Sequence, residues 1–334
     1  MDAVFAEIDK ETIKFAAGDE EKWRELYEPL YPETPSNVTV IRNERYGPHE
    51  RNFLDVFVPH DGAENKPVLM YIHGGGFFSG DKMWSERVYS NIGWFFAQHG
   101  IVTVVVNHRL VPHVQYPGGA DDVQLAREWI YENIASEKYG CGSIDKVVLF
   151  GHSSGGAHVA MNLFAAGEML LLRFFGRVYA KAESAGDPAR PPKVPDFPPV
   201  AGLVLIDVPF WFDRTKPVRQ RTIRSYYGSD DESDWGPKSA LGLFQALPED
   251  SPVLDSQKIP IYLGSVEWEV PETIDATIKF FNAYKAKSKP AGTLPLFHVT
   301  KRHNHVSNVL SIGTEDTSQS QPVLDFIRTC VGSK

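Results

Sequence analysis

Cysteine is scarce in this chain of 334 residues, which contains only Cys141 and Cys330. Two cysteines do not make a disulfide framework, so the composition favours a reducing compartment and we expect a cytoplasmic protein. The chain also lacks an apolar run long enough to cross a bilayer, and its acidic, amphipathic first residues do not resemble a signal peptide. We therefore expect neither a membrane span nor secretion.

Basic residues are outnumbered as well, with 34 Lys and Arg against 43 Asp and Glu and a net charge of −9. A nucleic-acid surface needs clustered Lys and Arg, so the charge balance predicts no nucleic-acid partner. The metal-binding patterns H-E-x-x-H and C-x-x-C are missing too. We expect no metal ion and no cofactor.

The apolar and charged fractions, 42% and 23%, are ordinary for a globular protein. Short apolar segments alternate with longer segments of helical character, and this alternation predicts a single α/β domain over residues 1–334. We expect a mostly parallel, eight-stranded sheet with helices on both faces. The predicted strands are 38–41, 53–58, 68–72, 101–106, 147–150, 200–206, 260–264 and 294–299. The predicted helices are 84–98, 121–139, a helix directly after Ser153, 271–286 and 321–331.

Three segments lie outside this alternation. Residues 1–35 carry a helical apolar stripe and either help to roof an active site or pack on the core. Residues 168–199 and 209–254 are predicted cap insertions that form a pocket wall. The second insertion is rich in aromatic residues, which either line an acyl or aryl pocket or belong to the core. These aromatic residues are Phe210, Trp211, Phe212, Tyr226, Tyr227 and Trp235.

The central stretch of the chain is Gly151-His152-Ser153-Ser154-Gly155, which fits the pattern G-x-S-x-G. A β-branched apolar run precedes it and small residues follow it, so it predicts a strand, a sharp turn and a helix, with Ser153 on the turn. Alone this motif is weak, because about one chain in ten of this length contains it by chance.

A second motif strengthens the first. His73-Gly74-Gly75-Gly76 follows the predicted strand at 68–72. Consecutive glycines after a strand can turn their backbone N–H groups inward, and acyl transfer needs such donors for the negative charge of its tetrahedral intermediate.

Together the two motifs resemble the α/β-hydrolase fold, and within it the HGGG-bearing esterases of the hormone-sensitive-lipase type and their kynurenine-formamidase-like relatives. The resemblance extends from about Phe53 to the C-terminus. It implies Ser153 as nucleophile and an oxyanion hole from the N–H groups of Gly75, Gly76 and Ser154, with His73 fixing the glycine loop. It also implies the chain order of serine, acid and histidine.

The acid is expected after the predicted strand at 260–264. Glu267 stands three residues past Gly264, where the related esterases usually carry Asp, and it is the preferred candidate. Glu269 is the alternative. A carboxylate in this loop that is not part of the site would be an ordinary solvated residue.

The base is expected after the last strand, where His303-Asn304-His305-Val306 offers two candidates. In kynurenine-formamidase-like enzymes the base precedes a residue pair and then an aliphatic residue, which matches His303. His303 is therefore preferred and His305 is the alternative. His298 falls within the predicted strand and is expected to pack.

The resulting prediction is a serine hydrolase that cleaves a carboxylic ester, or an activated amide such as an aryl formamide, through an acyl-enzyme. Its partner is a small-molecule substrate, and the protein is expected to be a monomer or homodimer. Three alternatives remain open. They are non-hydrolytic acyl transfer or condensation at the same site, a ligand receptor on the same fold, and a protein that acts through its interactions.

Overall fold

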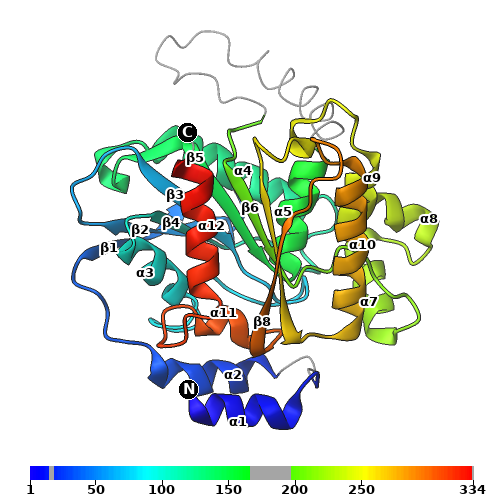
Figure 1. Cartoon of the computed structure of the whole chain (residues 1–334), viewed down its shortest axis with the longest axis horizontal. Coiled ribbons are helices and arrows are strands. Elements are labelled where there is room, and N and C mark those ends of the chain that lie inside the picture. The colour runs from blue at the N-terminus through cyan, green and yellow to red at the C-terminus, as the bar shows by residue number, and fades with distance from the viewer. Residues whose placement is uncertain (15–18, 166–196, 333–334) are drawn as a thin grey trace.

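A computed structural model describes residues 1–14, 19–165 and 197–332 of the chain (Figure 1). Most of the predicted insertion at 168–199 lies outside the described residues. No helix in the described part is both long and apolar enough to cross a membrane.

The centre of the molecule is one eight-stranded sheet in the order β1-β2-β4-β3-β5-β6-β7-β8. Only the pairs β1–β2 and β2–β4 are antiparallel, and all other neighbours are parallel. This confirms the predicted fold class. The strands are β1 (Val38–Arg45), β2 (Phe53–Pro59), β3 (Lys66–Ile72), β4 (Val102–Val106), β5 (Gly142–His152), β6 (Gly202–Ile206), β7 (Ile261–Trp268) and β8 (Leu296–Asn304).

The central strands are continuous apolar runs because helices cover both faces of the sheet. Successive side chains of a strand point to opposite faces. On β5, Val147 and Leu149 therefore join one core cluster, while Val148 and Phe150 join another. Each face buries its own set of residues, as expected for a parallel sheet.

One face of the sheet is covered by α3 (Ser90–Gln98) and α12 (Ser320–Gly332), which lie in front of it in Figure 1. The other face packs against α4 (Gly118–Asn133), α5 (Ser154–Phe164), α9 (Ala240–Ala246) and α10 (Pro271–Lys287). The remaining helices are α1 (Asp2–Glu11), α2 (Glu20–Tyr27), α7 (Pro217–Tyr227), α8 (Glu232–Trp235) and α11 (Ser307–Ser311). Single 3₁₀ turns occur at Glu28–Leu30, Glu137–Tyr139, Gly236–Lys238 and Pro252–Leu254.

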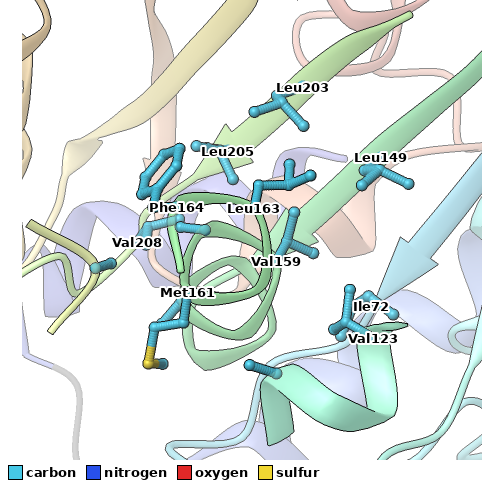
Figure 2. Packing of buried hydrophobic residues seen from close by; sticks show 14 of the residues in the cluster. Ile72, Val123, Leu149, Val159, Met161, Leu163, Phe164, Leu203, Leu205 and Val208 are labelled. Carbon is cyan, nitrogen blue, oxygen red and sulfur yellow. The ribbon is translucent and has the colours of Figure 1, made fainter. Parts of the chain in front are cut away.

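Helix α5 is the most deeply placed of these elements. Every one of its residues is buried, and Figure 2 shows Val159 and Leu163 packed against Leu149 and Leu203 of the sheet. Helix α5 also buries the polar side chain of Asn162, which has partners in the interior in Arg127 and in the carbonyl oxygen of Ala120. Its first residue follows Ser153 directly, so the packing of α5 fixes the position of that serine.

The N-terminal helices α1 and α2 lie against the end of β8 and against α11 (Figure 1). Trp23 and Tyr27 of α2 form a small core with Val306 and Leu310. The hydroxyl of Tyr31 donates a hydrogen bond of 2.7 Å to the carbonyl oxygen of Leu310. This core ties α1 and α2 to the segment that follows β8.

The main errors of the sequence prediction concern element ends. Strand β7 was expected to end at Gly264 and continues to Trp268, and β8 was expected to end at Val299 and continues to Asn304. The two strands pair with each other over these extra residues, up to Trp268 and Asn304. Backbone pairing between neighbours thus extends strands beyond what their own apolar patterns indicate.

Helix boundaries differ as well. The helix expected at 84–98 begins only at Ser90, because Tyr89 before it has a left-handed backbone with φ of 67°. The helix expected at 121–139 spans Gly118–Asn133 and is followed by a separate 3₁₀ turn.

Candidate active site

Ser153 lies on a sharp turn between β5 and α5. Its backbone angles are φ 52° and ψ −127°, which an L-residue adopts only under strain. The predicted strand, turn and helix are therefore present. Such a turn lifts the serine hydroxyl out of the sheet toward the space beyond the carboxyl ends of the strands.

Gly155 is required by this turn. A Cβ atom at this position would lie 2.3 Å from the carbonyl oxygen of His73 and 2.4 Å from that of Ile72. No larger residue fits there unless the backbone shifts. The glycine thus allows α5 to start directly against β3, which brings Ser153 close to the glycine loop that follows β3.

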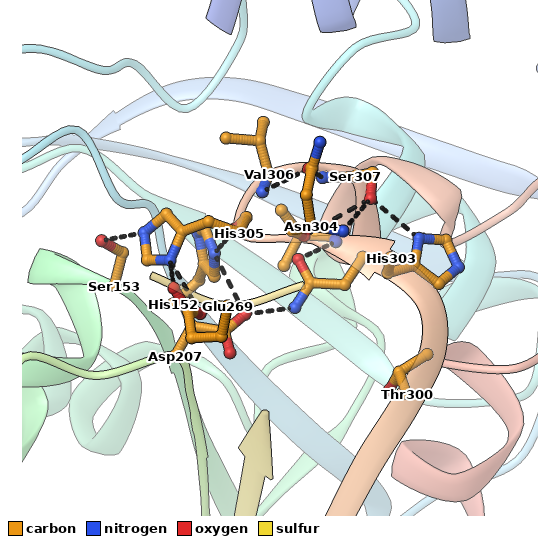
Figure 3. Close-up of polar contacts among 12 residues, drawn as sticks. His152, Ser153, Asp207, Glu269, Thr300, His303, Asn304, His305, Val306 and Ser307 are labelled. Carbon is orange, nitrogen blue, oxygen red and sulfur yellow. Dashed lines mark hydrogen bonds and ion pairs between the residues drawn. The ribbon is translucent and has the colours of Figure 1, made fainter. Parts of the chain in front are cut away.

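The hydroxyl of Ser153 forms a hydrogen bond of 2.9 Å with Nε2 of His305. The other ring nitrogen of His305, Nδ1, lies 2.9 Å from both carboxylate oxygens of Glu269. Figure 3 shows the imidazole of His305 between the serine and the carboxylate. A hydroxyl, an imidazole and a carboxylate in a hydrogen-bonded row form the arrangement that activates a serine.

Glu267, the preferred acid candidate, lies elsewhere. Its carboxylate accepts a hydrogen bond of 2.9 Å from the N–H of Arg302 and lies 3.3 Å from Nζ of Lys301. The hydrogen bond from Arg302 lowers the pKa of Glu267. Because β7 runs through residue 267, the first acidic residue past the strand is Glu269. The expectation that Glu267 contacts the histidine is corrected in favour of the alternative, Glu269.

His303, the preferred base candidate, is also placed away from Ser153. It belongs to β8, its side chain is completely buried, and its ring hydrogen-bonds to Ser307 and to the carboxylate of Asp316. Figure 3 shows its ring directed away from Ser153. The strand ends one residue later, and His305 is the first histidine in the loop, so the alternative candidate is the one that reaches the serine.

A further buried pair, His152 and Asp207, supports the row, and sequence reasoning missed both roles. Nε2 of His152 donates a hydrogen bond of 2.8 Å to the carbonyl oxygen of His305, which holds the histidine loop. Asp207 follows β6, is fully buried, and accepts a hydrogen bond from Nδ2 of Asn308. The available signal was position, because His152 ends β5 and Asp207 directly follows β6, the strand between β5 and β7.

Burial controls the ionisation of these groups. It raises the pKa of Glu269 to about 7 and lowers the pKa of His305 below its ordinary value. It raises the pKa of Asp207 well above its ordinary value, and the negative charge of Glu269 adds to this effect. Both effects favour the neutral form of the Asp207 carboxyl.

The glycine loop after β3 faces the same space. Gly75 has φ 130° and Gly76 φ 61°, and a Cβ on Gly75 would lie 1.9 Å from the carbonyl oxygen of Ser79. His73 holds the loop as expected, with Nδ1 2.7 Å from the carbonyl oxygen of Gly74 and Nε2 3.1 Å from Oδ1 of Asn107. The loop conformation thus depends on glycine and on a buried histidine.

A cavity of about 560 Å³ opens over Ser153 and His305. This volume suits a small-molecule ligand. Gly75, Gly76 and Ser154 line it together with the serine. Elements distant in sequence complete the wall, namely α2 through Glu20 and Arg24, and α7 through Arg219, Arg221 and Thr222.

The aromatic residues expected to line this cavity lie elsewhere. Phe210, Phe212, Tyr226, Tyr227 and Trp235 are buried in the main core cluster, and Trp211 packs against it. The aromatic side chains at the cavity are instead Phe77, Phe78 and Tyr89. The second insertion contributes mainly charged and polar side chains to the cavity wall. Its aromatic composition did not indicate this.

One group of possible metal ligands occurs among the described residues. His152, Asp207 and His305 bring ligand atoms within 4.8 Å of one another. All three already have hydrogen-bond partners. His152 bonds to the carbonyl oxygen of His305, and Asp207 to Asn308. His305 bonds to Ser153 and Glu269. These contacts account for the cluster without a metal ion.

Comparison with known families and sequences gives a consistent result. The family model described as BD-FAE matches residues 54–172. Acetylcholinesterase 4 from Caenorhabditis briggsae is 31% identical over 191 residues, which cover 51% of this chain and 30% of the relative. Para-nitrobenzyl esterase from Bacillus subtilis is 34% identical over 119 residues, covering 32% of this chain and 23% of the relative. The matches thus cover less than a third of each relative's own length.

Solved structures resemble almost the whole chain. Esterase B from Lactobacillus rhamnosis superposes with a TM-score of 0.69 at 17% identity, over 99% of this chain and 95% of that one. A bacterial heroin esterase superposes with a TM-score of 0.62 at 20% identity, over 99% and 98%. The chain has the α/β-hydrolase fold, and the predicted resemblance to esterases of this fold is confirmed.

Proposed function

We propose, from this α/β-hydrolase fold and its serine site, that the protein is a carboxylic ester hydrolase that acts on a small molecule. The observation that carries the proposal is the row Ser153–His305–Glu269, with both hydrogen bonds at 2.9 Å, beside a glycine loop and a cavity of about 560 Å³. The esterase names of the relatives support the same reaction class.

In the proposed mechanism the oxygen of Ser153 attacks the ester carbonyl carbon while its proton passes to Nε2 of His305. Glu269 accepts the Nδ1–H of His305 and stabilises the positive charge that forms on the ring. The backbone N–H groups of Gly75, Gly76 and Ser154 are the proposed donors to the oxyanion. Each such donor typically lowers the barrier by about 3–4 kcal/mol.

The intermediate then collapses, and the leaving alkoxide takes the proton from His305. An acyl group remains on Ser153. Water attacks this ester, with His305 acting again as base, and releases the carboxylic acid. The same chemistry extends to an activated amide such as an aryl formamide, whose leaving group also accepts the proton from His305.

Replacing the nucleophile tests the proposal. Ser153→Ala should lower kcat/KM for short p-nitrophenyl esters by about a thousandfold or more, because no hydroxyl remains to attack the carbonyl. A fluorophosphonate should label the wild type at Ser153 and leave the variant unlabelled. Circular dichroism should confirm that the variant is folded.

The alternatives give different results in the same assays. A ligand receptor on this fold would hydrolyse no ester and would not react with the fluorophosphonate. An acyltransferase would be labelled, but it would release product faster when an alcohol or amine acceptor is added. Full esterase activity in Ser153→Ala would exclude the proposed nucleophile.

A further inference from the structure

The cavity over Ser153 is lined by more positive than negative charge, although the chain as a whole carries a net charge of −9. The charged side chains in its wall are Glu20 and the three arginines Arg24, Arg219 and Arg221. These residues come from α2 and α7, which are almost two hundred positions apart in sequence. The excess of arginine is therefore a property of the assembled cavity.

Arg24 is held in place by neutral partners. Its Nε and Nη2 atoms each lie 3.3 Å from the hydroxyl of Tyr89, and its guanidinium lies over the rings of Trp84 and Tyr89. A guanidinium has five N–H donors, so these contacts orient Arg24 and leave donors available. Among the described residues, no carboxylate lies within ion-pair distance of it.

Arg221 of α7 also lines the cavity and also stacks on an aromatic ring. Its guanidinium lies 5.2 Å from the centre of the Phe78 ring, and Phe78 also lines the cavity. Within the described part of the chain, Arg221 has no ion-pair partner either. Stacking on an aromatic ring keeps the planar donor fork of an arginine oriented for a carboxylate.

Arg219 is different because its charge is already compensated. Its Nε donates a hydrogen bond of 2.8 Å to the carboxylate of Glu272, which also lies 3.8 Å from Nζ of Lys216. The two arginines without a carboxylate partner therefore determine what the cavity attracts, and among the described residues that line it only Glu20 carries an opposing charge. Bidentate binding of a carboxylate is the contact that an arginine makes best.

We propose that the substrate is an ester that carries a second, anionic group, a carboxylate, which Arg24 and Arg221 bind in the cavity over Ser153. This inference rests on the proposed esterase function and adds the substrate class. The carboxylate belongs either to the acyl chain, as in a monoester of a dicarboxylic acid, or to the leaving group. The two arginines come from two different helices, so the experiment includes both cases.

Two matched ester pairs test the proposal. The first compares 4-nitrophenyl hydrogen adipate with 4-nitrophenyl hexanoate, and the second compares 4-acetoxybenzoate with 4-acetoxybenzamide, each corrected for spontaneous hydrolysis. In at least one pair, kcat/KM for the anionic ester should exceed that of its neutral partner by about tenfold, mainly through KM. The preference should shrink at high salt, because these arginines are partly exposed.

Arginine variants separate binding from chemistry. In the double variant Arg24→Gln/Arg221→Gln, the ratio of anionic to neutral kcat/KM should fall by about tenfold or more. Arg224→Gln is the matched control, because Arg224 lies on the same helix but outside the cavity wall and is paired with Asp230. The control should retain the wild-type ratio. No preference in either pair, or equal ratios in all three proteins, would overturn the proposal.

A binding measurement keeps this inference distinct from the proposed reaction. Adipate should bind to the wild type in calorimetry and bind about tenfold more weakly to the double variant. If adipate binds in this way but no ester is hydrolysed, the esterase proposal fails and the anion site stands. If neutral esters are hydrolysed, neither anionic ester is preferred and adipate does not bind, the anion site fails alone.

Discussion

His303 and His305 are only two residues apart, yet the structure gives them unrelated surroundings. His303 hydrogen-bonds to Asp316. Burial raises the pKa of the Asp316 carboxyl, but this hydrogen bond and others outweigh burial and lower the pKa to about 2. His305 lies between Ser153 and Glu269. The same side chain thus stabilises the fold at one position and can serve as a base at the other.

Parallel substitutions should separate these roles. His305→Gln should lower kcat/KM by about a thousandfold or more at nearly wild-type stability, because the proton acceptor is lost. His303→Gln should instead lower the unfolding free energy by about 1–3 kcal/mol, because buried hydrogen bonds are lost. Esterase kinetics and urea unfolding of both variants provide the measurement. Loss of catalysis in a fully folded His303→Gln would contradict the assignment.

The pH dependence of activity follows from the buried carboxylate. His305 must be neutral to accept a proton, and burial lowers its pKa, so it is neutral at pH 7. Glu269 must be ionised to stabilise the protonated ring, and burial raises its pKa to about 7. Activity should therefore rise with pH through about 7, with the Glu269–His305 pair titrating as a unit.

The measurement is kcat/KM for a neutral ester between pH 5 and 9. Glu269→Gln removes the carboxylate, so the remaining activity should be low and its acid limb should move below pH 7, toward the lowered pKa of His305. A wild-type profile that is flat from pH 5.5 to 8 would show that Glu269 does not control the site.

At the scale of elements, the ends of strands decide which side chains can meet. Strand β7 ends at Trp268 and β8 at Asn304, so Glu269 and His305 are each the first residue past a strand. Because neighbouring parallel strands end at the same edge of the sheet, these two residues lie side by side there. Ser153 follows β5 at the same edge.

Any side chain at Gly155 should destabilise the protein, because α5 and β3 lie in close contact there. Gly155→Ala places a Cβ 2.3 Å from the carbonyl oxygen of His73, and the backbone must shift. We expect a loss of about 1–3 kcal/mol in unfolding free energy and a large loss of activity, because Ser153 moves with α5. Urea unfolding and ester kinetics give the two readouts.

Gly332→Ala is the matched control for this prediction. Gly332 lies in α12, and a Cβ there would meet nothing within 4 Å. This variant should remain within about 0.5 kcal/mol of the wild type. Equal effects of the two substitutions would show that the contact at Gly155 is not limiting.

At the scale of the whole molecule, the N-terminal helix α2 is part of the active-site wall. The core formed by Trp23, Tyr27, Val306 and Leu310 joins α2 to the segment that begins one residue after His305. Arg24 of the same helix lines the cavity. Packing of α2 is therefore linked to the position of the loop that contains His305.

Trp23→Ala should test this link. Trp23 is completely buried, so its loss should cost about 3–5 kcal/mol of unfolding free energy. It should also lower kcat under conditions where the variant is folded, because α2 no longer supports the loop of His305. Trp94→Ala on α3, outside the cavity wall, is the control and should change stability alone. An unchanged kcat in folded Trp23→Ala would refute the link.

Local patterns predicted a large part of this molecule. The eight strands, their approximate positions and the turn at Ser153 follow from apolar runs and from glycine at required positions, because these signals depend on neighbours in sequence. The same signals misplaced the ends of β7 and β8, where pairing between two strands adds residues that neither pattern contains. The preference for Glu267 and His303 failed for that reason.

Local sequence patterns were enough to predict the fold class, the serine at the turn and the short segments that had to contain an acid and a base. They could not predict that His305 contacts Ser153 and that Glu269 contacts His305, since strand ends depend on partners far along the chain. The tertiary structure decided these contacts, and it also decided that the cavity carries arginines from α2 and α7. A catalytic row and a charged pocket depend on distances between segments that are remote in sequence. Packing sets these distances, and local sequence patterns do not contain them.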